Sequence, residues 1–317
     1  MDNLTHSMIG ALLGQAGLKR KSGLGMPTAI IAANIPDIDA SCTVFGTLSL
    51  AMRRGLTHGP VAMLVLPALL TGIMVAYDRW QGRRGRRPDG RAPVNPGWLF
   101  VIALIGTLSH PAMDWMNSYG VRLLSPFSDR WFYGDTLFII DLWLWIGLIG
   151  GFIWSRRAEK RNDVTWIGRA RIVCTVACVY IFANGVITGV AEAAARDAYL
   201  AAKGQAPEMV VANPLPVAFW RREILWRGGG HYGSAGFDLL GAPMLGRLAD
   251  AGATGMDDPA IAAAKQHDAR ARAFLFWSRM PTVRRRDDGA MVIGDQRFVG
   301  RGLGQFTIIV PAQALKP

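Results

Sequence analysis

Apolar residues in this chain are gathered into long blocks instead of being spread evenly. Three blocks approach the length of a membrane-spanning helix: residues 60–77, 136–154 and 172–191. A helix needs about 20 apolar residues to cross a hydrocarbon core about 30 Å thick. The first and third blocks carry no charge, and the second carries only Asp141. We therefore expect all three blocks to span a membrane.

Three shorter apolar segments complete the amino-terminal pattern. Residues 98–108 form a helix that spans only if it continues through His110 to Trp115. Residues 8–18 and 24–35 are shorter than a span needs, and we expect half-inserted or re-entrant helices there. The first thirty residues are not a secretory signal, because they lack a basic start and a long apolar core.

Composition narrows the class of protein. Of 317 residues, 51% are hydrophobic and 18% are charged, against about 25% charged in a typical soluble domain. This balance excludes a disordered chain, a collagen and a small disulfide scaffold. The three cysteines suggest neither a disulfide framework nor a metal motif.

Basic residues orient the predicted helices. They cluster after three apolar segments, within residues 19–21, 79–91 and 156–171. Loops rich in lysine and arginine stay on the cytoplasmic side of a membrane. The net charge of +12 is therefore explained by the membrane topology and by attraction to anionic lipid headgroups. No nucleic-acid partner is expected. We expect a multi-pass membrane protein.

The composition changes after Ala191. Residues 218–226 and 231–240 flank a triple glycine, and residues 282–286 and 290–298 flank Asp287-Asp288-Gly289, both of which are hairpin signals. Residues 259–274 have a helical period, and 307–310 form a last strand. We predict an all-α polytopic membrane bundle over 1–191 and a C-terminal α+β, mostly β, extramembrane domain over 192–317. That domain would lie outside the cytoplasm, and its protein partner is unknown.

Polar residues of a ligand type collect at the predicted outer ends of the apolar segments: His6, Asp37, Asp39, His58, His110 and Asp114. We expect a helix to begin or restart at Pro111, because proline is preferred at the first helical position. His110 and Asp114 would then share one helical face and could bind one metal such as zinc. Alternatives without a metal remain. His110 could simply be hydrogen-bonded to Asp114 at a helix end, Asp37 and Asp39 could lie in a solvated loop, and His58 could be an interfacial histidine. His231 and His267 are expected to be structural.

A family resemblance rests on five motifs that occur in a fixed order. They are Thr5-His6-Ser7, Pro36-Asp37-Ile38-Asp39, Arg54-Gly55-Leu56-Thr57-His58-Gly59, Ser109-His110-Pro111-Ala112-Met113-Asp114 and the stretch from Pro126 to Asp135. Over residues 1–155 the chain resembles a bacterial inner-membrane family of metal-dependent hydrolases, and it is distantly similar to the zinc-dependent phospholipase C and P1 nuclease group. That group has a further histidine and His-x-x-x-Glu set. None follows Asp114 here, so one or two metal ions fit better than three.

The resemblance implies a divalent metal, most simply zinc, held by the six residues above. Asp37 or Asp39, whichever is not a ligand, would accept a proton during catalysis. The loop from Ser125 to Asp135 would cover the site, and Arg130 would hold a phosphate, or else anchor the chain at the interface. Three further carboxylates would orient the imidazoles: Asp129, Asp135 and Asp141.

The sequence thus predicts a membrane-bound metal-dependent hydrolase at the outer face of the bilayer. A site at the lipid boundary favours an amphiphilic substrate, such as a phospholipid or another phosphodiester. The alternative is a non-catalytic membrane protein: a scaffold, an envelope-assembly factor or a small transporter. These would need no metal at the cluster.

Overall fold

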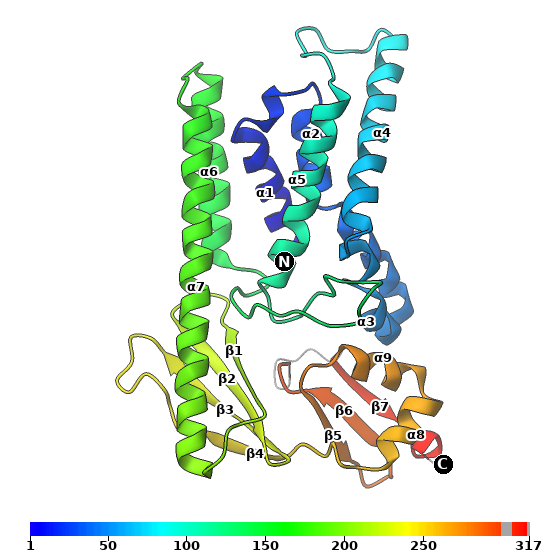
Figure 1. Cartoon of the computed structure of the whole chain (residues 1–317), viewed down its shortest axis with the longest axis vertical. Helices are drawn as coiled ribbons and strands as arrows, with labels where there is room; N and C mark the ends of the chain where they lie inside the picture. Colours follow the sequence, from blue (N-terminus) through cyan, green and yellow to red (C-terminus); the bar gives the residue numbers. More distant parts are fainter. Residues whose placement is uncertain (299–305, 316–317) are drawn as a thin grey trace. The chain divides into compact units, whose positions relative to one another are not determined.

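The computed structural model describes residues 1–298 and 306–315 of the chain (Figure 1). Its α-helices are α1 (Asn3–Gln15), α2 (Gly25–Ala32), α3 (Ser49–Met52), α4 (Ala62–Arg83), α5 (Pro96–Trp115), α6 (Leu142–Lys160), α7 (Trp166–Lys203), α8 (Ala260–His267) and α9 (Ala269–Trp277). The 3₁₀ helices are η1 (Leu18–Arg20), η2 (Ile35–Leu48), η3 (Leu56–His58) and η5 (Ala312–Leu315). The strands are β1 (Met209–Pro214), β2 (Arg221–Gly228), β3 (His231–Asp238), β4 (Ala249–Ala253), β5 (Pro281–Arg285), β6 (Met291–Asp295) and β7 (Thr307–Val310).

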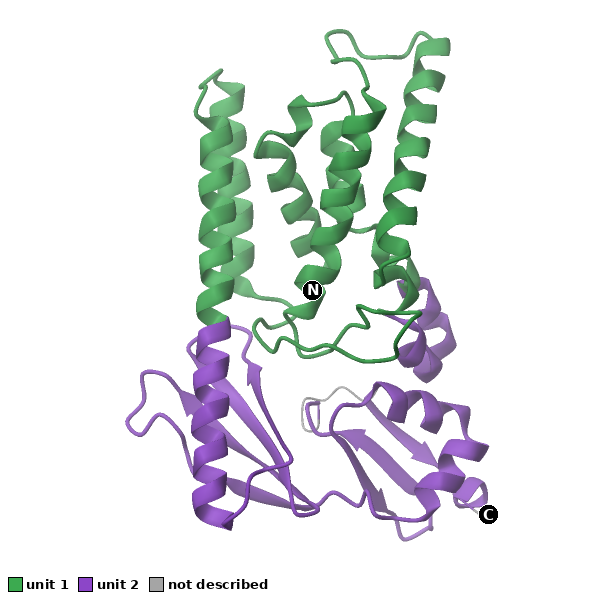
Figure 2. Ribbon diagram, in the orientation of Figure 1, with its two compact units in different colours: residues 1–39, 54–184 green, residues 40–53, 185–317 purple. Residues whose placement is uncertain are grey.

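The chain divides into two compact units, coloured separately in Figure 2. Unit 1 holds residues 1–39 and 54–184, and unit 2 holds residues 40–53 and 185–317. The division falls inside α7, because the second half of this helix packs its apolar side chains on a sheet. The predicted domain boundary after residue 191 stays a prediction.

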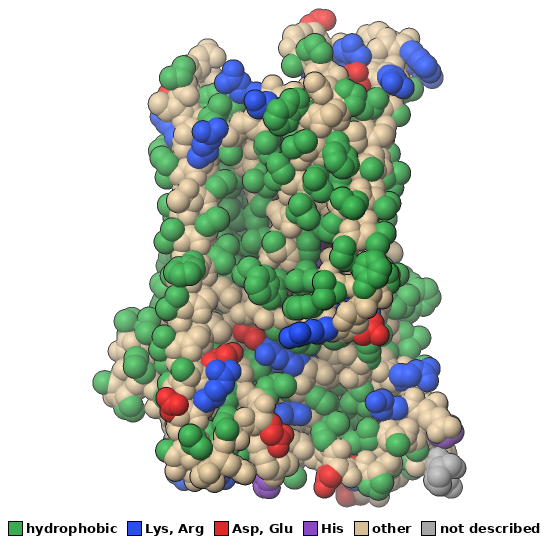
Figure 3. Space-filling model, in the orientation of Figure 1, with side chains coloured by type: hydrophobic (Ala, Val, Ile, Leu, Met, Phe, Trp, Pro, Cys, Tyr) green, Lys and Arg blue, Asp and Glu red, His purple; other side chains and the backbone are tan. Residues whose placement is uncertain are grey.

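Three helices in the described residues are long and apolar enough to cross a membrane: α4, α5 and α7. Two of them match the predicted blocks at 60–77 and 172–191, and α5 continues through His110 to Trp115 as a span requires. The predicted block at 136–154 differs, because α6 begins at Leu142 and ends in a charged turn. Figure 3 shows hydrophobic side chains over the helices of unit 1, and lysine and arginine at the end where the α4–α5 and α6–α7 loops lie.

One expected helix start was wrong, and one helix runs beyond its uncharged block. Pro111 does not begin a helix, because it lies within α5, which already begins at Pro96 behind the capping side chain of Asn95. The α4 helix does not end at Tyr77 but runs six residues further, to Arg83. The reason is an ion pair: Arg87 and Arg91 both bind Asp78 and so close the loop onto the last turns of α4.

Small residues bring three helices of unit 1 close together. A Cβ added to Gly10 of α1 would lie 2.6 Å from the Ala29 carbonyl oxygen of α2. One added to Gly106 of α5 would lie 2.7 Å from the Ala32 Cβ, also on α2. Small residues allow such close approach in membrane bundles, where helices associate by packing and not by exclusion of water. The α2 helix is therefore held between α1 and α5, the helices that carry His6, His110 and Asp114.

Unit 2 confirms the predicted α+β tail. Strands β1 to β4 form an antiparallel four-stranded sheet in that order, and β5, β6 and β7 form an antiparallel three-stranded sheet. Both predicted hairpins are present, as β2–β3 and β5–β6, and β7 spans the predicted residues 307–310. The predicted helix over 259–274 is split into α8 and α9 at Asp268, whose extended backbone and side chain cap α9.

Tight apolar packing stabilises the first sheet of unit 2. Its core joins Ala191, Ala195 and Tyr199 of α7 to Trp226 and Phe237 of the sheet. Burying a large apolar side chain stabilises a fold by roughly 1.5–3 kcal/mol relative to leaving it exposed.

Candidate metal centre

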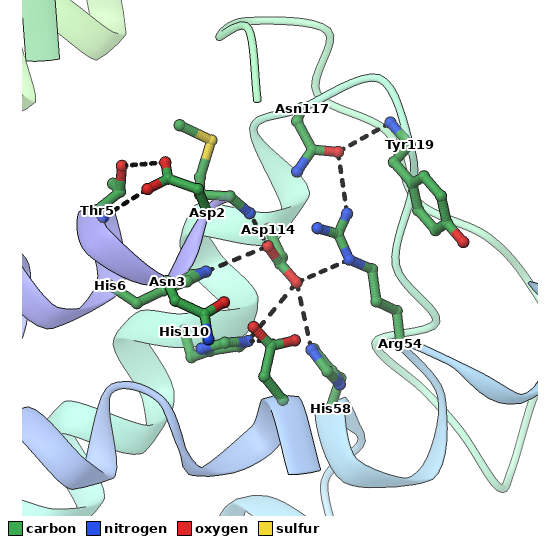
Figure 4. Close-up of polar contacts among 12 residues, drawn as sticks. Asp2, Asn3, Thr5, His6, Arg54, His58, His110, Asp114, Asn117 and Tyr119 are labelled. Carbon is green, nitrogen blue, oxygen red and sulfur yellow. Dashed lines mark hydrogen bonds and ion pairs between the residues drawn. The ribbon is translucent and has the colours of Figure 1, made fainter. Parts of the chain in front are cut away.

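Four of the predicted ligand residues come together in unit 1. One side-chain ligand atom from each of Asp37, His58, His110 and Asp114 lies within 4.8 Å of the other three. Asp37 lies in η2, His58 ends η3, and His110 and Asp114 lie one turn apart in α5. Figure 4 shows the side chains of His58, His110 and Asp114 directed toward a common point. Residues from three separate segments thus form one compact group.

The distances in this group suit a single small cation. The His58 Nε2 lies 3.2 Å from the Asp114 Oδ2. The His110 Nε2 lies 3.7 Å from the same oxygen and 3.6 Å from the Asp37 Oδ1. Ligands at about 2.0–2.1 Å from a tetrahedral zinc are roughly 3.3 Å apart. Three of the four residues are fully buried, and Asp37 is nearly so.

Both histidines are held by the nitrogen that faces away from the group. The His110 Nδ1 lies 2.7 Å from the Ala33 carbonyl oxygen, which can only accept, so Nδ1 carries the proton. The Thr57 hydroxyl donates to the Asp39 Oδ2 at 2.7 Å and lies 2.9 Å from the His58 Nδ1, which therefore donates to it. In each ring the Nε2 lone pair is left to face the group. Metal-binding histidines are oriented by outer hydrogen bonds of this kind.

The inward-facing imidazole nitrogens have no hydrogen bond of their own. Within the described residues, the His58 Nε2 and the His110 Nε2 are buried and make none, and the Asp114 Oδ2 that they face is paired with the Arg54 Nε at 3.0 Å. With their outer nitrogens protonated, the two rings direct acceptors toward a carboxylate, and burying such atoms unsatisfied costs free energy. A proton or a cation among them removes that cost. The donor set, two imidazoles and two carboxylates, is one that zinc and similar divalent ions bind. The residues therefore fit a metal.

His6 lies beside the four-residue group. Its ring stacks on that of His110 with centroids 3.8 Å apart, and its Nε2 lies 3.4 Å from the Asp114 Oδ1. Burial lowers the pKa of His6 to about 4, although Asp114 acts in the opposite direction. His6 is therefore neutral at neutral pH. Asp2 caps the helix that carries His6, because its carboxylate accepts from the backbone amides of Leu4 and Thr5.

Asp37 is the least buried member of the group. Burial raises the pKa of its carboxyl, but the neighbouring His110 ring outweighs this and leaves the pKa below its ordinary value. Asp37 is therefore ionised at neutral pH and can provide a negative charge to a bound cation.

Arg54 is a member of the site that the sequence did not reveal. Its Nε lies 3.0 Å from the Asp114 Oδ2, and its Nη1 donates to the Asn117 Oδ1 at 3.1 Å. The amino group of Met1 also contacts Asp114. Arg54 stands in one of the recognised motifs, but its role depends on a backbone at φ 53° that turns it inward. No spacing in the sequence shows this.

The other predicted site residues lie outside the group of four. Asp39 stands behind His58, where its Oδ2 accepts from the Thr57 hydroxyl and from the Arg54 amide. Of the two aspartates, the geometry thus favours Asp37 as a ligand. Arg130 is exposed, with its guanidinium over the Phe132 ring, and none of its contacts within the described residues is with the group.

The three carboxylates predicted to orient imidazoles are placed differently from one another. Asp129 is exposed and pairs with Arg122. Asp141 is buried and caps α6, and its side chain accepts from the Tyr180 hydroxyl. Asp135 is buried at positive φ. Asp39 contacts the Thr57 hydroxyl beside the His58 ring, and the orienting role of the other three carboxylates stays a prediction.

Comparison with known proteins identifies the amino-terminal part of the chain. The family described as YdjM inner membrane protein matches residues 1–191, which include every residue of the cluster. No curated protein and no solved structure matches the chain. The inner-membrane part of the resemblance is thereby confirmed, and its hydrolase part stays a prediction. Because the match covers more than half of the sequence and agrees with the apolar helices, this chain belongs to the YdjM inner membrane protein family.

Proposed function

We propose that this chain is a membrane-bound metal-dependent hydrolase. One observation supports this above all: two buried imidazole nitrogens, the Nε2 atoms of His58 and His110, make no hydrogen bond and converge on an oxygen of Asp114. Membrane proteins rarely bury ionisable groups without a functional reason. We infer that Asp37, His58, His110 and Asp114 hold a divalent ion, most simply zinc, with His6 and Asp39 beside them.

The surrounding residues have defined roles in this proposal. A bound zinc or similar ion supplies a water whose pKa is lowered towards ~7. The Ala33 carbonyl and the Asp39–Thr57 pair fix the two imidazoles. Asp39, the aspartate that is not among the four ligands, has a buried Oδ1 without a hydrogen bond in the described residues and can accept a proton there. Arg54 holds Asp114 in place and offsets its charge.

An amphiphilic substrate fits the surroundings of the cluster. Ile38 lies between the two aspartates and is 63% exposed, and Leu56 in the His58 turn is 65% exposed. Phe127 in the neighbouring loop is 76% exposed. Large apolar side chains exposed next to a buried polar centre are typical of binding surfaces. We propose a lipid-like ester as substrate, a phosphodiester in particular, with Arg130 as the holder of its phosphate.

The proposed membrane orientation follows from charge. The basic α4–α5 and α6–α7 loops would face the cytoplasm, which places the cluster, at the opposite ends of α4 and α5, on the periplasmic side. Unit 2, which follows α7, would then be periplasmic as well.

One observation favours a non-catalytic role instead. Arg54 and the Met1 amino group both contact Asp114, and two cations can balance two aspartates without a metal. The cluster would then be an ion-pair network that holds α1 and α5 together in a scaffold, an assembly factor or a small transporter. Metal content separates the two functions, because only the first needs a bound ion.

The deciding experiment measures metal in the purified full chain. Wild type is compared with His110→Ala, Asp114→Ala and the control His267→Ala, which changes an exposed histidine of the tail. We expect close to one divalent ion per chain in wild type and control, and loss in the two cluster variants. Asp114→Asn, which keeps the side-chain shape, repeats the test if the alanine variants aggregate. Equal, sub-stoichiometric metal in all of them would falsify the metal site and with it the hydrolase.

Activity is tested separately on the metal-loaded chain. The substrates are a chromogenic phosphodiester and phospholipid vesicles, and Asp39→Asn is compared with wild type. We expect hydrolysis by wild type and a loss of about 10²–10⁴-fold in the variant, the usual contribution of a positioned general base. Stoichiometric metal with no hydrolysis of either substrate would exclude a phosphodiesterase while leaving the metal site intact.

A further inference from the structure

A groove between α4 and α5 lies away from the metal cluster. Its volume is about 700 Å³, and it is within the size range of ligand sites. Ala68, Gly72 and Ala76 line one side of it from α4, and Phe100 closes it from α5. These positions on α4 are four residues apart, so they share one face of the helix.

The same helical face ends in two arginines. Arg79 and Arg83 line the groove at the end where α4 passes into the basic loop. Both are exposed, and within the described residues neither makes an ion pair. The nearby carboxylate on α4, Asp78, is already bound by Arg87 and Arg91. Two positive charges are therefore left to meet an anion from outside the chain.

Aromatic residues mark the level of this end in a membrane. Tyr77 and Trp80 stack with centroids 5.9 Å apart and are 45% and 43% exposed. The Arg84 guanidinium lies over the Trp80 ring. Tryptophan and tyrosine gather where lipid headgroups meet the hydrocarbon core. The arginine end of the groove therefore belongs at headgroup level, and its apolar part belongs at the level of acyl chains.

We propose that this groove is a binding site for an anionic phospholipid. Arg79 and Arg83 bind the headgroup phosphate, and the small residues of α4 admit an acyl chain beside Phe100. Basic pockets between membrane helices recognise anionic headgroups in this way. A second groove, between α6 and α7, provides the contrast. It measures about 330 Å³ and is lined by residues such as Trp143, Leu148 and Ile172, with no charged side chain.

The test counts lipids that stay on the full chain in detergent, by native mass spectrometry. Phosphatidylglycerol or phosphatidylcholine with the same acyl chains is added at increasing concentration. We expect tighter retention of phosphatidylglycerol by wild type, and a loss of roughly 30-fold in Arg79→Gln/Arg83→Gln, from two arginines near the headgroup. The matched control is Arg86→Gln/Arg157→Gln, which removes two exposed arginines outside the groove and should change nothing.

A steric variant tests the acyl part. A Cβ at Gly72 meets nothing within 4 Å, so Gly72→Leu fills the groove without displacing the protein. It should weaken retention, whereas Gly150→Leu, an equally open position on α6, should not. Equal retention of the two lipids, equal losses in both arginine pairs, or full retention by Gly72→Leu would each overturn the proposal. If the double variant aggregates, Arg83→Gln alone is compared with Arg86→Gln.

Discussion

The two units each bury a carboxylate completely, and they satisfy it in opposite ways. Asp295 of unit 2 receives two guanidinium donors of Arg297 at 2.9 and 2.8 Å, the Arg297 amide, the Ser278 hydroxyl and the Met280 amide. Asp114 of unit 1 contacts Arg54 and the Met1 amine, but it also faces imidazole nitrogens that carry lone pairs. The Asp295 carboxylate is surrounded by hydrogen-bond donors, whereas the Asp114 carboxylate also faces two imidazole acceptors.

The comparison separates a buried carboxylate that stabilises the fold from one whose surroundings suit a bound cation. A buried ion pair holds its fold only when its remaining hydrogen-bond positions are filled, as at Asp295. At Asp114, hydrogen bonds to the outer nitrogens of His58 and His110 orient both rings so that their Nε2 lone pairs face the carboxylate. Such an arrangement is unfavourable alone and favourable around a cation. We therefore expect substitutions at the first site to change stability and at the second to change metal binding.

The largest expected effect is on stability at Asp295. Asp295→Asn leaves the buried guanidinium of Arg297 without its counter-charge, and breaking a buried pair in this way costs about 3–5 kcal/mol. Hydrogen exchange of the β6 amides measures this opening locally. Metal content should stay at the wild-type value. A change of less than about 1 kcal/mol would show that the pair is not what stabilises this sheet.

The second prediction concerns pH. Burial raises the pKa of Asp295, but the charge and hydrogen bonds of Arg297 outweigh this and bring it to about 2, below the ordinary 3.8. A depressed pKa adds stability above pH ~4 that is lost as the pH falls towards ~2, here about 2 kcal/mol. Exchange of the β6 amides is measured from pH 6 to pH 3, and the difference between wild type and Asp295→Asn should narrow by about 1 kcal/mol over this range. Parallel curves over this range would contradict the assignment.

The smallest expected effect is at Thr57. Thr57→Val keeps the shape but removes the hydroxyl that joins Asp39 to His58, so the imidazole loses its orientation. Loss of such an outer partner typically weakens metal binding by about 10–100-fold, and we expect the lower end. Competition with a zinc indicator measures the affinity. The matched control is Ser278→Ala, which removes a hydroxyl that donates to Asp295 and should leave metal affinity unchanged. Equal losses of metal affinity in the two variants would contradict the different roles of Asp114 and Asp295.

Sequence alone predicted the elements whose signal is local. The uncharged blocks identified α4 and α7, and turn residues identified the β2–β3 and β5–β6 hairpins. Ends set by tertiary contacts were missed: the last turns of α4 depend on Asp78 binding arginines of the following loop, and α7 continues beyond its apolar block to Lys203. Local composition cannot show either.

The residues of the candidate site were named from their types and from their positions at helix ends. Asp37, His58, His110 and Asp114 were named from their positions at helix ends, and the structure gathers them. The choice of Asp37 over Asp39 depends on the Thr57 hydroxyl, and the contribution of Arg54 depends on an unusual backbone angle. Arg130 was selected for its chemistry, but its placement over Phe132 is set by the fold of its loop.

The contact between His110 and the Ala33 carbonyl spans 77 positions of the chain, and it has a consequence for biogenesis. During synthesis, α2 and Asp37 leave the ribosome long before α5 can supply His110 and Asp114. Until then the early segments expose an unmatched carboxylate at the membrane and have no complete set of ligands. Loading of any ion must follow insertion of α5, so nascent chains stalled before residue 110 would be unable to retain one.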